Sequence, residues 1–478
     1  MCSPGIDMGE LMIKKDMSRG KYEMNMCEGP ILGKMLKFAI PLMLSSILQL
    51  LFNAADVVVV GKFAGDASLG AVGCTGSMIN LLTNLFVGLS VGANVMTARH
   101  YGAKREYELS ESIHTSMLVA VIAGAVLMAV GLLFSEKILI LMGTPEDILP
   151  KATLYLSIYF LGMIANMVYN FGSAILRAVG DTKRPMYYLA FAGVINVGLN
   201  LLLVISFKLD VAGVAIATVI SQCISALLVV RCMVKDTGNI KLELRRLHIN
   251  RKELKQIVQI GIPAGLQGCI FSLSNVVIQS AINSFGSTFV SGSSAAANLE
   301  GFVYMAMNAF HHTTLAFMSQ NFGAGHYGRL RKVIICGLGC VAVTGIVLGN
   351  IEVLFGKYLL KIYTDSPAVI DAGMIRLKYI CTAYFLCGLM DVMVGVLRGI
   401  GYSVMPMIVS LCGACGLRLL WIGTGFRLEQ YHTIGGLFIS YPVSWLITFL
   451  VHFICYLCVR KKAVPVVEKE SAFQEENI

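Results

Sequence analysis

The chain has 478 residues, of which 56% are hydrophobic and only 14% are charged. About a quarter of the residues in soluble domains are charged, so this composition excludes a soluble globular protein and indicates one that crosses a membrane many times. The net charge of +10 is explained by basic loops between membrane spans, so it requires no nucleic-acid partner.

Long apolar runs recur along the chain, and a helix needs roughly 20 apolar residues to cross a bilayer. The clearest runs cover residues 39–61, 116–134, 186–205, 211–230, 333–351 and 437–459. Together with less uniform runs they predict an all-α membrane protein of twelve helices, because a backbone in lipid must satisfy its own hydrogen bonds. The ends, 1–30 and 461–478, are predicted to be tails, and we expect 1–28 and 463–478 to be disordered.

The chain also repeats itself. "ARHYGAK" at 98–104 aligns with "SQNFGAG" at 319–325, and "LRAVGDTKRPM" at 176–186 aligns with "LRGIGYSVMPM" at 397–407, and the two alignments have the same separation along the chain. The segments 39–56 and 261–278 align at nearly that separation. This repeat predicts an N-lobe at 31–232, a basic cytoplasmic linker at 233–256 and a C-lobe at 257–460, related by a pseudo-two-fold axis along the membrane normal.

The basic residues predict the orientation. If the N-terminus is cytoplasmic and twelve helices alternate, most of the 38 Lys and Arg residues fall on the cytoplasmic side, and shifting the frame by one helix reverses the bias. We therefore expect a multi-pass protein of the cell membrane with both termini in the cytoplasm. Two lobes around a central site are typical of a transporter.

The first apolar run contains one carboxylate, Asp56, in line with Gln49 and Asn53 on the same helix face. Asp56 lies about 22 Å beyond Pro41 along the helix, in the outer half of the membrane. A charged Asp at the centre of a bilayer costs at least ~2.5–3.5 kcal/mol, so Asp56 either carries a proton or is held ionised by a cation. The alternative is an acid that only bridges neighbouring helices by hydrogen bonds.

A second polar stripe lies on the predicted fifth helix, where Asn196 and Asn200 are four residues apart, and Thr218 lies on the sixth. Together with Asp56 they offer oxygen ligands of the kind that Na⁺ binds. Considered without Asp56, the two Asn residues are equally explained as ordinary hydrogen-bonding groups between helices.

Polar groups in the first span and in the C-lobe spans, with one adaptable methionine, make up a candidate substrate cavity. They are Gln49, Asn53, Met163, Asn275, Gln279, Glu300, Asp391 and Arg418. Glu300 and Asp391 could attract a cationic substrate or take a second proton; either could equally be neutralised by Arg418 as a buried pair.

"FAIPLMLSSILQLLFNAADVVVVGKFAG", "NFGAG" and the paired "LRAVGDTKRPM" and "LRGIGYSVMPM" closely resemble the multidrug and toxic compound extrusion (MATE) family, bacterial and archaeal type. The resemblance implies two six-helix lobes and export coupled to inward H⁺ or Na⁺ flow. It places Asp56 at the essential acid, Asn196 and Thr218 at two partners of the archaeal cation site, and Pro41 at the bend of the first helix. Asn200 stands where that site has an Asp, which removes one negative charge.

The NorM-like branch has a Glu on the seventh helix where this chain has Phe271, and Asp391 does not align with that branch's acid, so the resemblance does not support a C-lobe cation site. We expect a monomeric antiporter that exports amphipathic, cationic small molecules, with no cofactor beyond the coupling ion. A flippase-like exporter of a lipid-linked or endogenous cargo is the alternative. A membrane enzyme is disfavoured because the sequence has no HExxH, GxSxG or nucleotide-binding loop.

Overall fold

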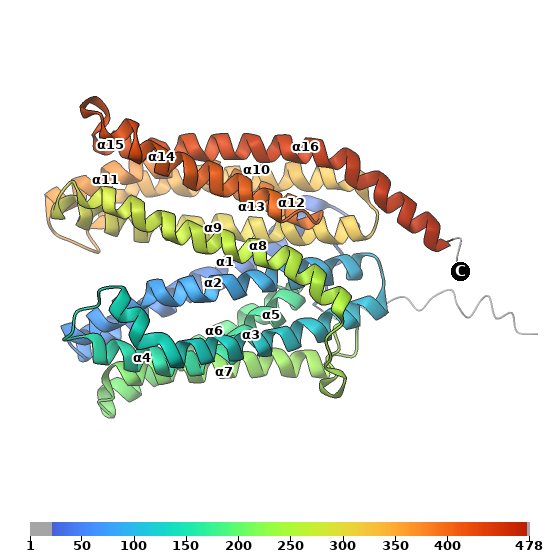
Figure 1. Cartoon of the computed structure of the whole chain (residues 1–478), viewed down its shortest axis with the longest axis horizontal. Helices are drawn as coiled ribbons and strands as arrows, with labels where there is room; N and C mark the ends of the chain where they lie inside the picture. The colour runs from blue at the N-terminus through green and yellow to red at the C-terminus, as the bar shows by residue number, and fades with distance from the viewer. Residues whose placement is uncertain (1–21, 476–478) are drawn as a thin grey trace, which may run out of the picture.

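The structure, a computed structural model, describes residues 22–475. Within that range all regular structure is helical, as predicted. Figure 1 shows two bundles of long helices running lengthwise, with α2–α7 in one and α9–α16 in the other, and the described chain begins and ends at the same, right-hand end. We call this end the terminal face and the opposite end the far face.

The N-lobe contains seven α-helices and one π-helical turn. They are α1 Ile31–Phe63, α2 Asp66–Gly102, α3 Glu106–Leu141, α4 Leu149–Leu161, α5 Met163–Ala178, α6 Lys183–Leu201, the π-helical turn η1 Leu202–Ser206 and α7 Asp210–Lys235. α4 and α5 form one span bent by 48°.

The C-lobe repeats this order. Its α-helices are α8 Arg251–Asn283, α9 Ser287–Gly323, α10 Tyr327–Leu360, α11 Pro367–Cys381, α12 Phe385–Gly399, α13 Val404–Ser410, α14 Leu417–Gly423, α15 Ile434–Phe438 and α16 Ser440–Glu475. The short elements are η3 Leu411–Gly416, η4 Gly425–Arg427 and η5 Glu429–Tyr431, and η2 Leu244–Arg246 lies in the linker. α11 and α12 form one span bent by 45°, the counterpart of α4 and α5.

By length and apolar composition, the described helices give up to eleven of the twelve predicted spans. Nine are long and apolar enough to cross a membrane, and the two bent pairs bring the number to eleven. The remaining span is α9, which has 37 residues like its repeat counterpart α2 but is more polar, with two adjacent histidines among its buried and half-buried positions.

Glycines let the two lobes touch directly where α2 crosses α8. A Cβ on Gly88 would lie 2.2 Å from the nitrogen of Gly265, and a Cβ on Gly92 would lie 3.1 Å from the nitrogen of Gly261. The four glycines form two GxxxG pairs, the spacing that permits close approach of helix backbones in membranes.

The helix α1 belongs to both lobes. Near the terminal face Met35 and Phe38 are fully buried in a cluster with α9 and α12 of the C-lobe. Near the far face Val59 and Val60 pack into the N-lobe core instead. Pro41 lies between these two regions, inside an α-helix that the structure shows as continuous.

The expectation of disordered tails is wrong where the structure describes them. Residues 22–29 are packed against both lobes, and Met26 is fully buried. Helix α16 continues through residues 463–475. Residues 1–21 and 476–478 lie outside the described range. The linker also differs from its expected bounds, because α8 begins at Arg251 and Ile240 and Leu242 are buried in the N-lobe core.

Candidate functional site

The site around Asp56 is built by three helices of the N-lobe. Asn200 Nδ2, on α6, donates a hydrogen bond to Asp56 Oδ1 on α1. The same nitrogen lies 3.2 Å from Asn196 Oδ1, and Asn196 Nδ2 lies 3.5 Å from Thr218 Oγ1 on α7. All four residues predicted for the cation or proton site are therefore brought together in one chain of hydrogen bonds.

Local sequence explains why these helices meet. Asn196 and Asn200 are one helical turn apart, so they share a face of α6. On a neighbouring turn Gly193 lets α1 approach, because a Cβ there would lie 1.8 Å from the ring of Phe52. Phe52 is four residues before Asp56, so the same contact fixes the carboxylate against α6.

The oxygen atoms of these four side chains are of the kind that bind a small cation, although only one of the side chains is charged. Asn200 is fully buried, and its Oδ1 has no hydrogen-bond partner in the described structure. An unpaired buried carbonyl oxygen costs about 1–3 kcal/mol, and a proton on Asp56 or a bound cation would satisfy it. The only acid of the four residues is Asp56, and no group of three or more His, Cys, Asp or Glu side chains within the described residues could hold a metal ion.

Two tyrosines that were not predicted to lie beside Asp56 complete the surroundings. Tyr155 and Tyr159 on α4 lie close enough to interact electrostatically with Asp56, and their rings stack at a centroid distance of 6.0 Å. The signal available in the sequence was their spacing of four residues, which places both on one helix face.

The predicted cavity residues differ in their burial. Gln49, Asn53 and Asn275 are exposed, and Gln279 donates to Asn283 on its own helix at 3.0 Å. Met163 has no exposed surface and belongs to the N-lobe core. It therefore lines no open cavity in this structure, and its assignment to the cavity is corrected.

Of the alternatives left open for Glu300, neutralisation is the one that the structure shows, but by Arg376 and not by Arg418. Both oxygens of Glu300 accept hydrogen bonds from Arg376 on α11, at 2.8 and 2.9 Å, and Arg376 also donates to Ser293. Arg418 instead donates to Ser444. Its guanidinium lies 4.1 Å from the ring centroid of Tyr441 and 5.3 Å from that of Trp445.

Asp391 is also separate from Arg418. It lies beside Tyr304 and Arg398, and its backbone oxygen accepts a hydrogen bond from His311 Nδ1 at 2.6 Å. The three charged residues proposed from the sequence, Glu300, Asp391 and Arg418, thus have three different sets of partners. Arg376 was overlooked because its span, interrupted between α11 and α12, is one of the less uniform apolar runs.

Comparisons with known proteins agree with this architecture. The family model MatE matches the chain twice, over residues 41–202 and 263–421, which confirms the internal repeat. "Probable multidrug resistance protein YoeA" of Bacillus subtilis (strain 168) is 26% identical over 89% of this chain and 93% of that protein. A "FAD transporter" of Shewanella oneidensis is 23% identical over 91% and 96%.

A similar solved structure is described as the outward-facing conformation of a multidrug resistance MATE family transporter of the MOP superfamily. It covers 95% of this chain and 100% of its own, with a TM-score of 0.85 and 20% identity, which shows a shared fold. Because the family model covers both lobes, the chain belongs to the MATE family of membrane transporters.

Proposed function

We propose that the protein is a secondary active exporter of amphipathic small molecules, driven by protons that bind at Asp56. It acts as a monomer in the cell membrane, with the terminal face in the cytoplasm. The supporting observation is the hydrogen-bonded chain from Asp56 through Asn200 and Asn196 to Thr218. A carboxylate held this way inside a membrane span marks an ion or proton pathway.

A proton fits this arrangement better than Na⁺ does. The amide nitrogen of Asn200 already faces the carboxylate, so an N–H donor stands where a cation would have to sit between the two side chains. Either ion neutralises the single charge of Asp56, but a desolvated Na⁺ also needs several oxygen ligands in place of its water shell, whereas a proton needs only one carboxylate oxygen. Coupling to Na⁺ is the alternative that the transport test below distinguishes.

Exchange follows from the position of α1. Protonation removes the charge of Asp56, so its hydrogen bond with Asn200 is no longer charge-assisted and the contact between α1 and α6 changes in strength. Because the other end of α1 is packed into the C-lobe, a shift of α1 changes how the two lobes fit together. Pro41 lies between the two contact regions and lacks the N–H that would brace the helix there, which makes it the proposed hinge. Coupling needs only that the proton binds the two access states with different affinities.

The substrate class is supported by the relatives and not by a charged cavity. Relatives are named as multidrug resistance or export proteins, which favours varied amphipathic molecules. The expectation of cationic substrates depended partly on Glu300, and this carboxylate is neutralised by Arg376. Export of an endogenous metabolite is the second candidate, because one relative covering 91% of the chain is named as a FAD transporter.

The test uses proteoliposomes with the terminal face outside, loaded with a pH gradient or a Na⁺ gradient separately. We expect uptake of ethidium, the probe compound, only with the pH gradient, and none for Asp56→Asn. FAD is assayed in parallel. Transport that follows the Na⁺ gradient alone would contradict the proton proposal, and transport by Asp56→Asn at the wild-type rate would remove Asp56 from the mechanism.

A further inference from the structure

The two lobes meet at the terminal face through contacts that obey the internal repeat. Arg99 at the end of α2 donates from Nη2 to the carbonyl oxygen of Gly399, at the end of α12, at 3.1 Å. Its counterpart in the second half of the repeat, Gln320 at the end of α9, donates from Nε2 to the carbonyl oxygen of Ala178, at the end of α5, at 2.6 Å. Each lobe thus caps a helix C-terminus of the other, where unpaired carbonyl groups accept donors.

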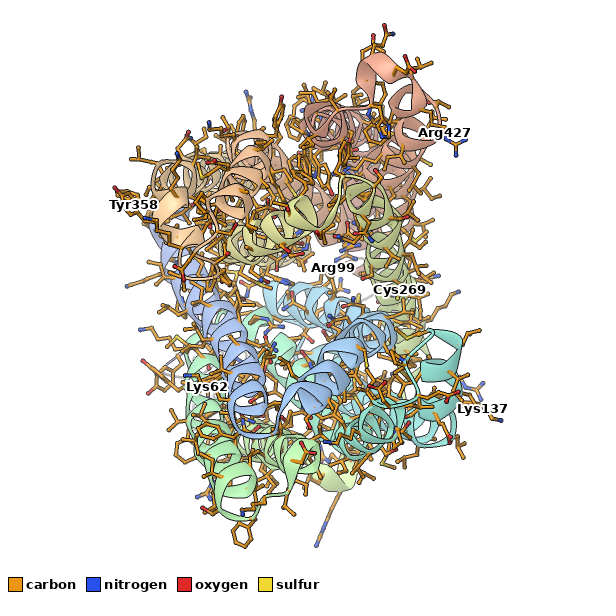
Figure 2. The ribbon with its side chains drawn as sticks, turned by 90° about the vertical axis from the view of Figure 1, so that its left-hand side faces the viewer. Lys62, Arg99, Lys137, Cys269, Tyr358 and Arg427 are labelled. Carbon is orange, nitrogen blue, oxygen red and sulfur yellow. The ribbon has the colours of Figure 1, made fainter. Side chains whose placement is uncertain are left out.

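The backbones around these donors also touch reciprocally. A Cβ on Gly102 would lie 2.1 Å from the backbone oxygen of Gln320, and a Cβ on Gly323 would lie 2.2 Å from that of Arg99. Gly102 and Gly323 occupy matching positions in the aligned segments "ARHYGAK" and "SQNFGAG". Seen from the far face, Arg99 lies between the two lobes (Figure 2).

The segment that precedes α1 closes the same junction, and we call residues 22–29 the strap. On the N-lobe side Met24 N donates to Val179 O at 3.1 Å, and Glu23 accepts a hydrogen bond from Tyr101 at 2.9 Å. On the C-lobe side Met26 N donates to Gln320 Oε1 at 3.2 Å, and its carbonyl accepts from Asn321 at 3.2 Å.

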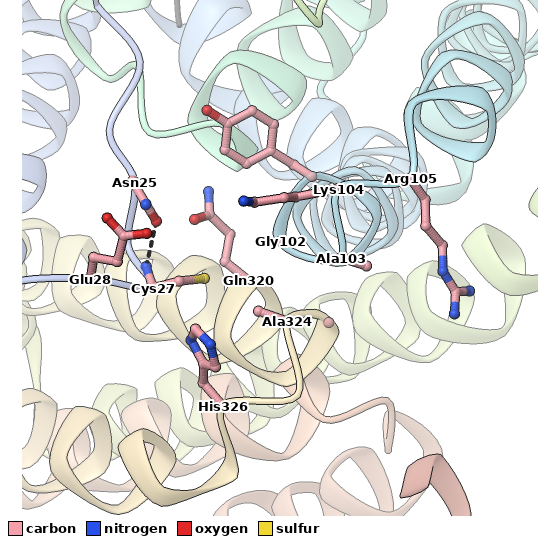
Figure 3. A pocket seen from close by; sticks show the side chains of 12 residues that line it. Asn25, Cys27, Glu28, Gly102, Ala103, Lys104, Arg105, Gln320, Ala324 and His326 are labelled. Carbon is pink, nitrogen blue, oxygen red and sulfur yellow. Dashed lines mark hydrogen bonds between the residues drawn. The ribbon is translucent and has the colours of Figure 1, made fainter. Parts of the chain in front are cut away.

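The strap also substitutes for a missing symmetric contact. Gly401 has φ +99° and is covered by the guanidinium of Arg99, whereas its counterpart Gly180, with φ +97°, is covered by Met24 of the strap. Gln320, the counterpart of Arg99, has a shorter side chain than arginine, so Met24 of the strap covers Gly180 instead. A cavity of about 380 Å³ separates the strap from the α2–α3 and α9–α10 turns, with Asn25, Cys27 and Lys104 around it (Figure 3).

We propose that the strap and the reciprocal pair Arg99 and Gln320 form a latch that holds the terminal face closed, and that the latch must release before the protein opens there. The proposal rests on the proposed function in one respect, the alternation of the two lobes. Since the strap is continuous with α1, movement of α1 at Asp56 would pull on the latch directly. The cavity behind the strap gives it room to move.

The experiment uses Cys27 of the full-length protein in lipid nanodiscs as the reporter. Burial raises the pKa of this thiol to about 11, so it reacts slowly while the strap is docked, and release toward an ordinary thiol pKa increases its thiolate fraction by up to roughly a hundredfold. Alkylation by N-ethylmaleimide is followed at each cysteine by peptide mass spectrometry. Cys458, which is exposed at the terminal-face end of its span, provides the rate reference, and Cys381, which is fully buried in the C-lobe, reports unfolding.

Gly102→Ala and Gly323→Ala wedge the lobes apart at the latch, whereas Gly328→Ala is the matched control because nothing lies within 4 Å of its Cβ. We expect Cys27 to react at least about tenfold faster in the two wedge variants, with Gly328→Ala and Cys381 unchanged. Unchanged Cys27 reactivity in folded wedge variants would overturn the proposal.

If Cys381 also becomes reactive, the glycine substitution has unfolded the protein. The variant Gln320→Leu then tests the latch. It removes the hydrogen bonds to Ala178 and Met26 without adding bulk, and we expect about fivefold faster alkylation of Cys27; no change would refute the latch. Alkylation needs no gradient or substrate. If the variants do not change Cys27 alkylation while proton-driven transport is normal, only the latch is refuted. If proton-driven transport is absent while the variants do change Cys27 alkylation, only the proposed function is refuted.

Discussion

The ion pair between Glu300 and Arg376 is expected to be a large determinant of stability when either partner is lost alone. The side chains are 7% and 12% exposed, and two parallel hydrogen bonds of 2.8 and 2.9 Å join them. Arg376→Met would leave the Glu300 carboxylate buried without its counter-charge. Breaking such a pair costs about 3–5 kcal/mol, whereas replacing both partners by neutral groups costs much less.

The assay is a double-mutant cycle in detergent, with Tm read by tryptophan fluorescence. For chains of 150–250 residues, the size of one lobe, 1 kcal/mol corresponds to about 2–4 °C, so Arg376→Met is expected to lower Tm by at least about 6 °C. The double variant Glu300→Gln with Arg376→Met should recover most of that loss.

Arg427→Met is the control, because Arg427 is exposed on the far-face loop (Figure 2) and its replacement should shift Tm by less than about 1 °C. A shift of Arg376→Met no larger than that of the control would refute the reasoning, as would a double variant no more stable than the single one.

Three further predictions concern other parts of the chain. Asn200→Asp restores a second acid beside Asp56 and should make Na⁺ raise Tm, which it should not do in the wild type; absence of any Na⁺ response would contradict the oxygen-site geometry. Gly193→Ala should reduce transport at least about tenfold by pushing Phe52 away, whereas Gly198→Ala on the same helix has open space and should not; equal effects would count against the contact. The Arg246 carbonyl and the Glu111 carboxylate raise the pKa of His248, so linker docking should be complete below pH about 6.5 and weaken as the pH rises through the folded value. Relative to its cleavage of an unstructured peptide at the same pH, trypsin should cut the linker faster at pH 8 than at pH 6, and His248→Gln should remove that difference; an equal relative rate at both pH values in the wild type would contradict this role of His248.

Much of the fold could be predicted because its signals are local. Apolar runs give spans, and the constant separation between the repeated segments gives two lobes. The close crossing of α2 and α8 follows from the GxxxG pairs at Gly88 and Gly261. The Asp56 cluster was also accessible, because Asn196 and Asn200 share one helix face and the resemblance supplied the pairing of that face with α1.

The partners of the C-lobe charges could not be predicted in the same way. Which arginine meets Glu300 depends on the depth and rotation of three helices, and hydropathy fixes neither. The strap was missed for another reason: its polar composition matches that of a disordered tail, and its order comes from backbone groups that bond to Gln320 and Val179. Sequence composition carries no information about such backbone contacts.

The most direct measurement for the central claim is the proton count on substrate binding. Purified protein in weakly buffered detergent solution is mixed with ethidium or FAD, and the released protons are followed with a pH dye. We expect about one proton released per bound substrate in the wild type and none in Asp56→Asn. Equal release from both proteins, or substrate binding by the wild type without any release, would contradict the central claim.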